Sequence, residues 1–270
     1  MFGSDFLGIL AWGVAAGGAL WGMIKGYKRW AGPRSHVGGG AVVTIVEFLQ
    51  FVREKARGPH VTIFLVATGG TGKTQLIRSL TNDENAQPQR KTTVAEMYSH
   101  SMNYTMAGSR LALPVTINVV DHVGQSMATV AEIAKGIRDI HIVVFMVDVR
   151  EPPPTYNQQV QPSPNVDDAR IKVHRDLWDG DMLSMTYGTL KRDSLCYVVL
   201  FINKLDLLTD RSEAVMNHVR DQYSGIRTEL VNLTHAEDRV VSIYGSALKG
   251  EGVPLLRQLI LAVMKERSIA

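Results

Sequence analysis

Short apolar runs alternate with helical patterns along most of the chain. Five runs rich in β-branched and aromatic residues predict buried strands at 61–66, 115–120, 140–149, 197–202 and 239–244. The segment 94–106 predicts a further strand that forms a hairpin with 115–120. Helical patterns lie between these strands, at 73–80, 126–138, 167–190, 212–233 and 253–266. This alternation predicts an α/β fold with a mainly parallel sheet and helices on both of its faces.

The longest apolar run, residues 6–24, carries no charged side chain. As a helix, 19 residues extend about 28 Å, close to the hydrocarbon thickness of a bilayer. Asp5 precedes the run and four basic residues follow it: Lys25, Lys28, Arg29 and Arg34. By the positive-inside rule, the chain after the run lies in the cytoplasm. We expect a single-pass membrane anchor in 1–30; a buried core helix and a cleaved signal peptide are the alternatives.

The chain after the anchor divides into a connecting part and one domain. Residues 31–40 are rich in glycine and predict a flexible linker, and 41–57 predict an amphipathic helix that packs on the domain or lies at the membrane interface. We therefore expect a linker and helix in 31–58 and the domain in 59–270. The content of hydrophobic residues, 45%, fits a globular core. The net charge of +3 is too small to indicate a nucleic-acid partner.

The single cysteine, Cys196, lies in the predicted buried strand that ends at residue 202, where we expect it to be a small core residue. One cysteine excludes a framework of disulfide bonds within the chain.

A glycine-rich loop follows the strand at 61–66, in the sequence VTIFLVATGGTGKTQL. A loop between a strand and a helix N-terminus directs backbone N–H groups at one point, where they bind an anion such as phosphate. Lys73 would reach the β- and γ-phosphates, and the Thr74 hydroxyl would bind Mg²⁺. The stretch resembles the Walker A P-loop of nucleotide triphosphatases, with Ala67 in place of the first glycine. The expected nucleotide ligands are Gly69, Gly70, Thr71, Gly72, Lys73, Thr74 and Gln75.

A second motif, Asp121-His122-Val123-Gly124-Gln125, follows the strand at 115–120. It resembles the D-x-x-G motif of the Ras/Arf-like GTPases. The resemblance implies that Asp121 holds Mg²⁺ through water and that the Gly124 N–H senses the γ-phosphate. Gln125 would orient the attacking water.

Two further motifs concern the base. Asn203-Lys204-Leu205-Asp206 matches the N-K-x-D guanine motif, because a carboxylate at Asp206 accepts from both N1–H and N2–H₂ of guanine. Adenine has no such pair of donors, and two charge-assisted hydrogen bonds give roughly 10²–10⁴ preference for guanine. Ser246-Ala247 resembles the S-A-K motif that backs the base, with Leu248 in the third place.

The polar stretch after 73–80 resembles switch I of the same family. Thr92 or Thr93 would bind Mg²⁺ and the γ-phosphate, and we place this role on Thr93. Arg90 stands three residues earlier, as the arginine finger in cis of Gα subunits does; a solvated loop arginine is the alternative. The expected metal ligands are Thr74, Thr93 and Asp121, and the expected catalytic residues are Gln125, Lys73 and Arg90.

A proline-rich insertion, around 151–166, separates the strand at 140–149 from the next helix. Proline excludes a helix or a central strand here, so the segment is a partner surface or a tolerated loop. In the helix that follows, we expect His174 to be structural or solvated rather than a ligand.

The resemblance to Ras/Arf-like P-loop GTPases covers about residues 60–266, and the anchor followed by such a domain is similar in layout to the beta subunit of the signal-recognition-particle receptor. It implies GTP/GDP and Mg²⁺ as cofactors and hydrolysis of GTP as a molecular switch, slow without a partner. A docking platform that holds GTP without hydrolysing it is the alternative. Asn203, Lys204 and Asp206 argue against an ATPase or a small-molecule kinase. The expected partners are the bilayer and effector or regulatory proteins, not nucleic acid.

Overall fold

The structure is a computed structural model that describes residues 60–81, 96–105, 112–121, 127–151 and 160–268. One sheet contains the strands β1 (His60–Ala67), β2 (Glu96–Thr105), β3 (Ala112–Asp121), β4 (Ile142–Asp148), β5 (Tyr197–Asn203) and β6 (Val240–Tyr244). The helices of eight or more residues in these ranges are α3 (Lys73–Thr81), α4 (Met127–Lys135), α5 (Asp168–Leu177), α6 (Gly180–Leu190), α7 (Glu213–Thr234) and α8 (Val253–Ser268).

The strands lie in the order β2-β3-β1-β4-β5-β6. All neighbouring pairs are parallel except β2 and β3, which form an antiparallel hairpin. Parallel neighbours require a crossover connection, and each crossover here carries a helix. The predicted α/β class, the mainly parallel sheet and the hairpin are confirmed.

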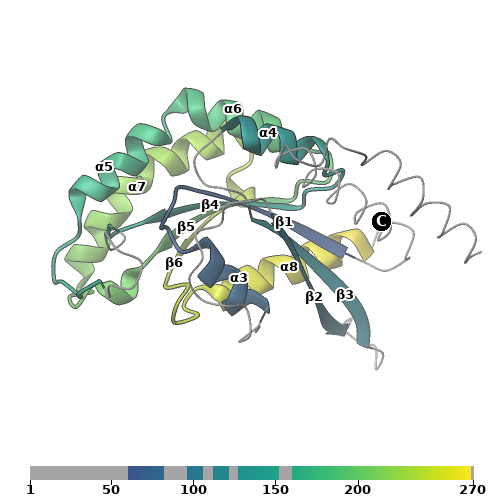
Figure 1. The fold of residues 1–270 in the computed structure, drawn as a ribbon, viewed down its shortest axis with the longest axis horizontal. Helices are drawn as coiled ribbons and strands as arrows, with labels where there is room; N and C mark the ends of the chain where they lie inside the picture. Colours follow the sequence, from purple (N-terminus) through teal and green to yellow (C-terminus); the bar gives the residue numbers. More distant parts are fainter. Residues whose placement is uncertain (1–59, 82–95, 106–111, 122–126, 152–159, 269–270) are drawn as a thin grey trace, which may run out of the picture.

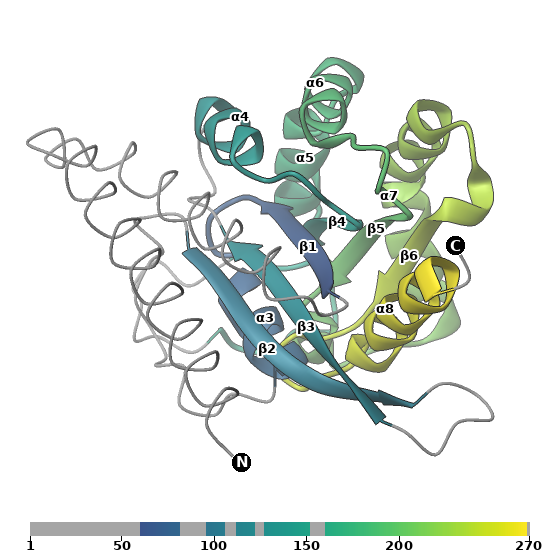
Figure 2. The same cartoon turned by 90° about the vertical axis from the view of Figure 1, so that its right-hand side faces the viewer.

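The sheet forms the middle of three layers (Figures 1 and 2). Helices α3 and α8 cover one face, and α4, α5, α6 and α7 cover the other. Every residue of β4 is buried, and its side chains alternate between the two faces. Val143, Phe145 and Val147 pack with the larger helix layer, while Ile142, Val144 and Met146 pack with α3 and α8. The continuous apolar run of β4 is therefore the signature of a strand covered on both sides.

The long helix predicted at 167–190 is two helices in the structure. The first ends at Leu177, and the backbone turns at Trp178, whose ring meets Phe145 edge to face at 5.4 Å. The Asp179 carboxylate accepts a hydrogen bond of 2.9 Å from the backbone N–H of Met182 and so caps α6. This N-cap starts a new helix and so divides the predicted one in two. The turn between the two helices lets the indole of Trp178 pack in the core.

Two other expectations are settled or bounded by the structure. Cys196 precedes β5 and is only half-buried, so its assignment to a buried strand was wrong by one position.

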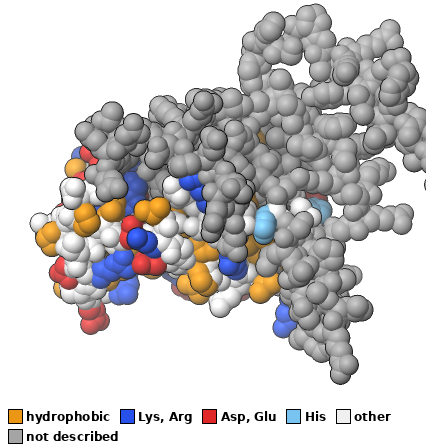
Figure 3. Space-filling model, turned by 60° about the horizontal axis from the view of Figure 1, so that its bottom comes forward, with side chains coloured by type: hydrophobic (Ala, Val, Ile, Leu, Met, Phe, Trp, Pro, Cys, Tyr) orange, Lys and Arg blue, Asp and Glu red, His pale blue; other side chains and the backbone are white. Residues whose placement is uncertain are grey.

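None of the described helices is long and apolar enough to cross a bilayer. The predicted anchor, linker and amphipathic helix, residues 1–58, lie outside the described residues, so those expectations stay predictions. On the face drawn in Figure 3, the described surface mixes acidic, basic and apolar side chains.

Candidate functional site

The carboxyl ends of the parallel strands meet at one edge of the sheet, and the predicted motifs follow them there. Ala67 of β1 lies opposite Met146 of β4, and Asp148 at the end of β4 lies opposite Asn203 of β5. Ile202 of β5 in turn pairs with Tyr244, the last residue of β6. In open α/β sheets, ligands bind at this edge.

The loop at 68–72 closes around the start of α3. Gly70 and Gly72 have positive φ values of 78° and 97°, a backbone region that glycine adopts without strain. The Thr71 hydroxyl is buried and donates a hydrogen bond of 2.8 Å to the Thr68 carbonyl. Lys73 curls back over the loop, and its Nζ donates to the Ala67 carbonyl at 3.5 Å. This strand, loop and helix start form a cradle with the geometry of an anion site.

The side chain of Asn203 joins two of the predicted motifs. Its Nδ2 donates to the Thr71 carbonyl at 2.6 Å, and its Oδ1 accepts from the Ala247 N–H at 2.7 Å. The loop packs so tightly here that a Cβ on Gly72 would lie 2.5 Å from the same Nδ2. Asn203 is 3% exposed, so both hydrogen bonds form away from water.

The residues around Asn203 complete the second half of the edge. Lys204 adopts the left-handed conformation, with φ of 65°, and starts the short 3₁₀ helix η2 (Leu205–Leu207) that contains Asp206. Asp206 is half-buried, and the described residues give its carboxylate neither a hydrogen bond nor an ion pair. Ser246 is buried and its hydroxyl accepts from the Lys249 N–H at 3.1 Å. The turn that follows β6 is thus built from internal bonds, and Leu248 is exposed.

Sequence reasoning missed a buried ion cluster centred on Asp148. Arg170 of α5 binds this carboxylate through two nitrogens, with Nε 2.7 Å from Oδ1 and Nη2 3.2 Å from Oδ2. Lys204 also contacts this carboxylate, with Nζ 2.8 Å from Oδ2. The same Arg170 Nη2 donates to the Thr68 hydroxyl and to the Gly69 carbonyl, both at 3.4 Å. The cluster therefore connects the loop at 68–72, which we call the phosphate-type loop, with the N-K-x-D motif.

Two further residues complete the cluster around Asp148. His174, one helical turn after Arg170, places Nε2 3.1 Å from Asp148 Oδ1, and the Tyr223 hydroxyl donates to the Asp148 carbonyl at 2.6 Å. His174 is fully buried, so of the two alternatives expected for it, structural or solvated, the structure shows the structural one. The only signals in the sequence were an acid that ends an apolar strand run and an Arg and a His spaced four apart on the next helix.

Electrostatics in the cluster favour an ionised Asp148. Burial raises the pKa of this carboxyl, but the hydrogen bonds with His174 and Arg170 and the charge of Lys204 outweigh it and hold the pKa far below its ordinary value. Burial also lowers the pKa of His174, against the opposite pull of Asp148. The cluster thus holds one buried anion against the guanidinium of Arg170 and the ammonium of Lys204.

The remaining predicted site residues are placed only in part. Thr74 and Gln75 lie half-buried in the first turn of α3. Asp121 is the last residue of β3 and pairs with Glu96 of β2, and nothing further is described for its side chain. Arg90, Thr92, Thr93, Gly124 and Gln125 lie outside the described residues. The roles expected for them stay predictions.

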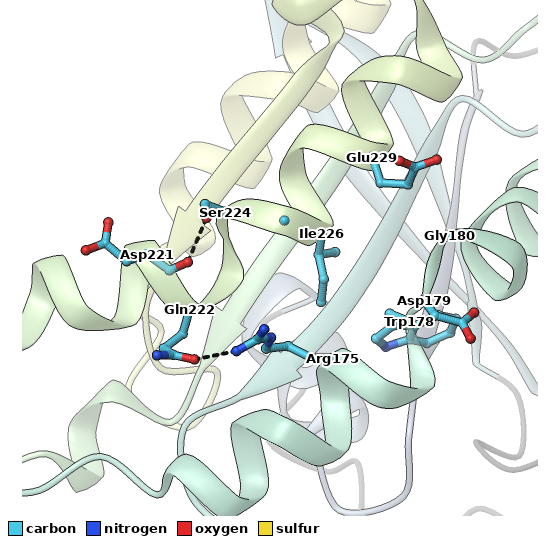
Figure 4. A pocket seen from close by; sticks show the side chains of 10 residues that line it. Arg175, Trp178, Asp179, Gly180, Asp221, Gln222, Ser224, Ile226 and Glu229 are labelled. Carbon is cyan, nitrogen blue, oxygen red and sulfur yellow. Dashed lines mark hydrogen bonds between the residues drawn. The ribbon is translucent and has the colours of Figure 1, made fainter.

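A groove of about 430 Å³ lies elsewhere, between the corner of α5 and α6 and the middle of α7 (Figure 4). Arg175 bonds Gln222 across it at 2.8 Å, and acidic side chains of Asp179, Asp221 and Glu229 line it. None of the motif residues of the carboxyl edge lines this groove, so it is separate from the candidate site.

Comparisons with known proteins do not assign a family. No protein-family model matches the chain, and no curated protein matches it. Among solved structures, a crystal structure of bacterial selenocysteine-specific elongation factor EF-Sec is similar, with a TM-score of 0.45 and 14% sequence identity. The match covers 77% of this chain and 29% of that one, so this chain spans under a third of the length of its neighbour.

Proposed function

We propose that this chain binds guanine nucleotide with Mg²⁺ at the carboxyl edge of the sheet and hydrolyses GTP as a molecular switch of the Ras/Arf-like type. The observation that carries the proposal is the pair of hydrogen bonds made by Asn203, to Thr71 in the phosphate-type loop and to Ala247 in the turn after β6. One buried amide thereby fixes the distance between the part of the site for phosphates and the part for the base.

The phosphate end fits a nucleoside di- or triphosphate. The first backbone N–H groups of a helix have no acceptor within the helix, and α3 starts directly after the loop, where the helix dipole adds positive potential. Lys73 is held over the loop by the Ala67 carbonyl, from which it can transfer its hydrogen bonds to phosphate oxygens. Thr74 and Asp121 would hold Mg²⁺, which supplies charge neutralisation between the phosphates.

The base end fits guanine better than adenine. Asp206 is held beside Lys204 by the bonds of η2, where its carboxylate can accept from two donors on the guanine edge. Ser246 and Ala247 would pack against the base. The hydrogen bond from the Ala247 N–H to the Asn203 amide fixes the turn that carries both residues. The expected preference is roughly 10²–10⁴ over adenine, the ratio that two charge-assisted hydrogen bonds give.

Hydrolysis is assigned to residues whose roles rest on the resemblance to the family. Gln125 would align the attacking water, Gly124 and Thr93 would sense the γ-phosphate, and Arg90 would stabilise charge in the transition state.

We further propose that residues 6–24 anchor the protein in a membrane, with the GTPase domain in the cytoplasm beside its effector or regulatory proteins. Extraction of full-length protein by carbonate, with a variant lacking residues 1–30 as the soluble control, tests the anchor.

A single-turnover GTP hydrolysis assay tests the switch. Gln125→Leu removes both hydrogen-bonding groups at similar volume, so it should leave GTP affinity nearly intact and slow the cleavage. Arg90→Ala, measured in parallel, should also be slow if the arginine finger acts in cis. If neither Gln125→Leu nor Arg90→Ala lowers the cleavage rate below that of the wild type, and that rate stays at background even with cell extract present as a source of partners, the chain is a docking platform that holds GTP.

A further inference from the structure

The end of the proline-rich insertion is bonded to the loop that follows Asp206. The Ser163 N–H donates to the Leu207 carbonyl at 2.9 Å, and the Ser163 carbonyl accepts from the Thr209 N–H at 3.0 Å. Ser163 and Leu208 thereby form an isolated parallel bridge. Leu207 is the residue directly after Asp206, so this bridge holds the loop that carries the expected base-reading carboxylate.

The local sequence prepares Ser163 for this contact. It stands between Pro162 and Pro164, neither of which has a backbone N–H. A residue before proline is restricted to extended conformations, which is the backbone that a parallel bridge needs. Ser163 therefore carries the single N–H donor of the tripeptide, and that donor is spent on Leu207.

Arg150 attaches the same segment a second time. Its Nη2 donates to the Gln161 carbonyl and its Nη1 to the Asn165 carbonyl, both at 3.3 Å. The carbonyl of Arg150 in turn accepts from Lys204 Nζ at 2.8 Å. Arg150 thus lies between the segment and the lysine of the N-K-x-D motif.

A third connection reaches the phosphate-type loop. The Asp167 N–H donates to the Val149 carbonyl at 3.2 Å, and the Asp167 carboxylate caps α5 by accepting from the Arg170 N–H at 3.0 Å. Arg170 extends from that first turn to the Thr68 hydroxyl and the Gly69 carbonyl. The position of the phosphate-type loop therefore depends on how the segment enters α5.

We propose that residues 161–167 are a positioning element that sets the lifetime of the bound guanine nucleotide. The segment holds the 204–209 loop from one side and, through the start of α5, the phosphate-type loop from the other. Release of a nucleotide bound between these loops requires at least one of them to move, and each bond to the segment resists that motion. This inference rests on the proposed function, because the ligand is the guanine nucleotide proposed there.

The test is the rate at which a fluorescent GDP analogue leaves the full-length protein when chased with unlabelled GDP. Ser163→Pro removes the N–H that bonds Leu207 and should accelerate release about tenfold, the effect of one backbone hydrogen bond. Ser163→Ala keeps both backbone bonds and removes only a hydroxyl that accepts from the Asn165 N–H, so it should release GDP at the wild-type rate. Single-turnover GTP cleavage should be unchanged in both variants.

Arg150→Met is the second variant, for the case in which Ser163→Pro does not fold. It removes two bonds to the segment and keeps the carbonyl that Lys204 uses, so it should also speed GDP release several-fold at an unchanged melting temperature. Arg227→Met on α7, which breaks an exposed ion pair with Glu237, is its matched control. Wild-type release rates in folded Arg150→Met overturn the inference. A wild-type protein that retains no guanine nucleotide at all would instead overturn the proposed function.

Discussion

Asn203 and Thr71 are 132 positions apart in the chain, and a hydrogen bond of 2.6 Å joins the Asn203 amide to the Thr71 carbonyl. The other end of the same amide accepts from the Ala247 N–H. Loops after β1, β5 and β6 are therefore fixed to one another by hydrogen bonds within the chain. A site built in this way loses little conformational freedom on binding, which favours affinity.

Replacement of Asn203 should weaken both stability and nucleotide binding. Asn203→Ala leaves the Thr71 carbonyl and the Ala247 N–H buried without partners, at a cost of roughly 1–3 kcal/mol each. We expect a loss of about 2–6 kcal/mol in the free energy of unfolding, measured with urea. Asn217→Ala, on the exposed face of α7, is the control and should change stability by less than about 0.5 kcal/mol. Equal stability of the two variants would contradict the bridging role.

Gly72 should tolerate no side chain. An added Cβ would lie 2.5 Å from Asn203 Nδ2, and φ of 97° is unfavourable for alanine. Gly72→Ala is expected to destabilise the fold by about 1–3 kcal/mol and to remove nucleotide binding, as measured by thermal unfolding with and without GDP. Gly188→Ala in α6, where nothing lies within 4 Å, should instead stabilise the protein by about 0.5–1 kcal/mol. A neutral Gly72→Ala would refute the close approach.

The negative charge of Asp148 should contribute more to the free energy of unfolding than the packing of its side chain. Asp148→Asn keeps the volume of the side chain but leaves Arg170 and Lys204 without their buried counter-ion. Breaking a buried pair by removing one partner costs about 3–5 kcal/mol, and we expect a loss of that size in urea unfolding. Asp221→Asn, exposed on α7, is the control. A loss below about 1 kcal/mol would mean that the cluster is not a stabilising ion network.

The sequence was most informative where chemistry and periodicity coincide. Apolar runs placed the strands to within three residues, and the glycines before Lys73 marked a loop in which Gly70 and Gly72 have positive φ values. The order of the motifs placed Asn203 and Ala247 at one edge, because parallel strands end on the same side.

The sequence was least informative about contacts between distant side chains and between loops. The contacts of Asp148 with Arg170 and Lys204 span 22 and more positions, and no local pattern specifies them. The bridge between Ser163 and Leu208 uses backbone atoms only, which carry no residue signature. The break before α6 did have a signal, since Asp179-Gly180 is an N-cap pair that interrupts the helical pattern.

Stability should fall as the pH is lowered from 6.5 to 4 because of His141. The fully buried imidazole accepts from the Thr62 N–H at 2.9 Å, and burial together with the charge of Arg267 lowers its pKa from 6.5 to about 4. Between these values only the unfolded chain binds the proton, so the free energy of unfolding should drop by roughly 2–3 kcal/mol. His141→Asn, whose Oδ1 can replace Nδ1, should lower this pH dependence in urea unfolding at pH 7 and 4.5. An unchanged slope would contradict the assignment.

The nucleotide specificity of the purified protein tests the central claim most directly. We predict that titration calorimetry with Mg²⁺ gives binding of GDP, with ADP weaker by a factor of roughly 10²–10⁴. Asp206→Asn should lose affinity for GDP and gain affinity for xanthosine diphosphate, whose ring edge has a carbonyl where guanine has an amine. Lys73→Ala should bind none of the three while remaining folded. Equal affinity of the wild-type protein for GDP and ADP would contradict guanine recognition by Asp206, and with it the assignment of this chain as a GTPase.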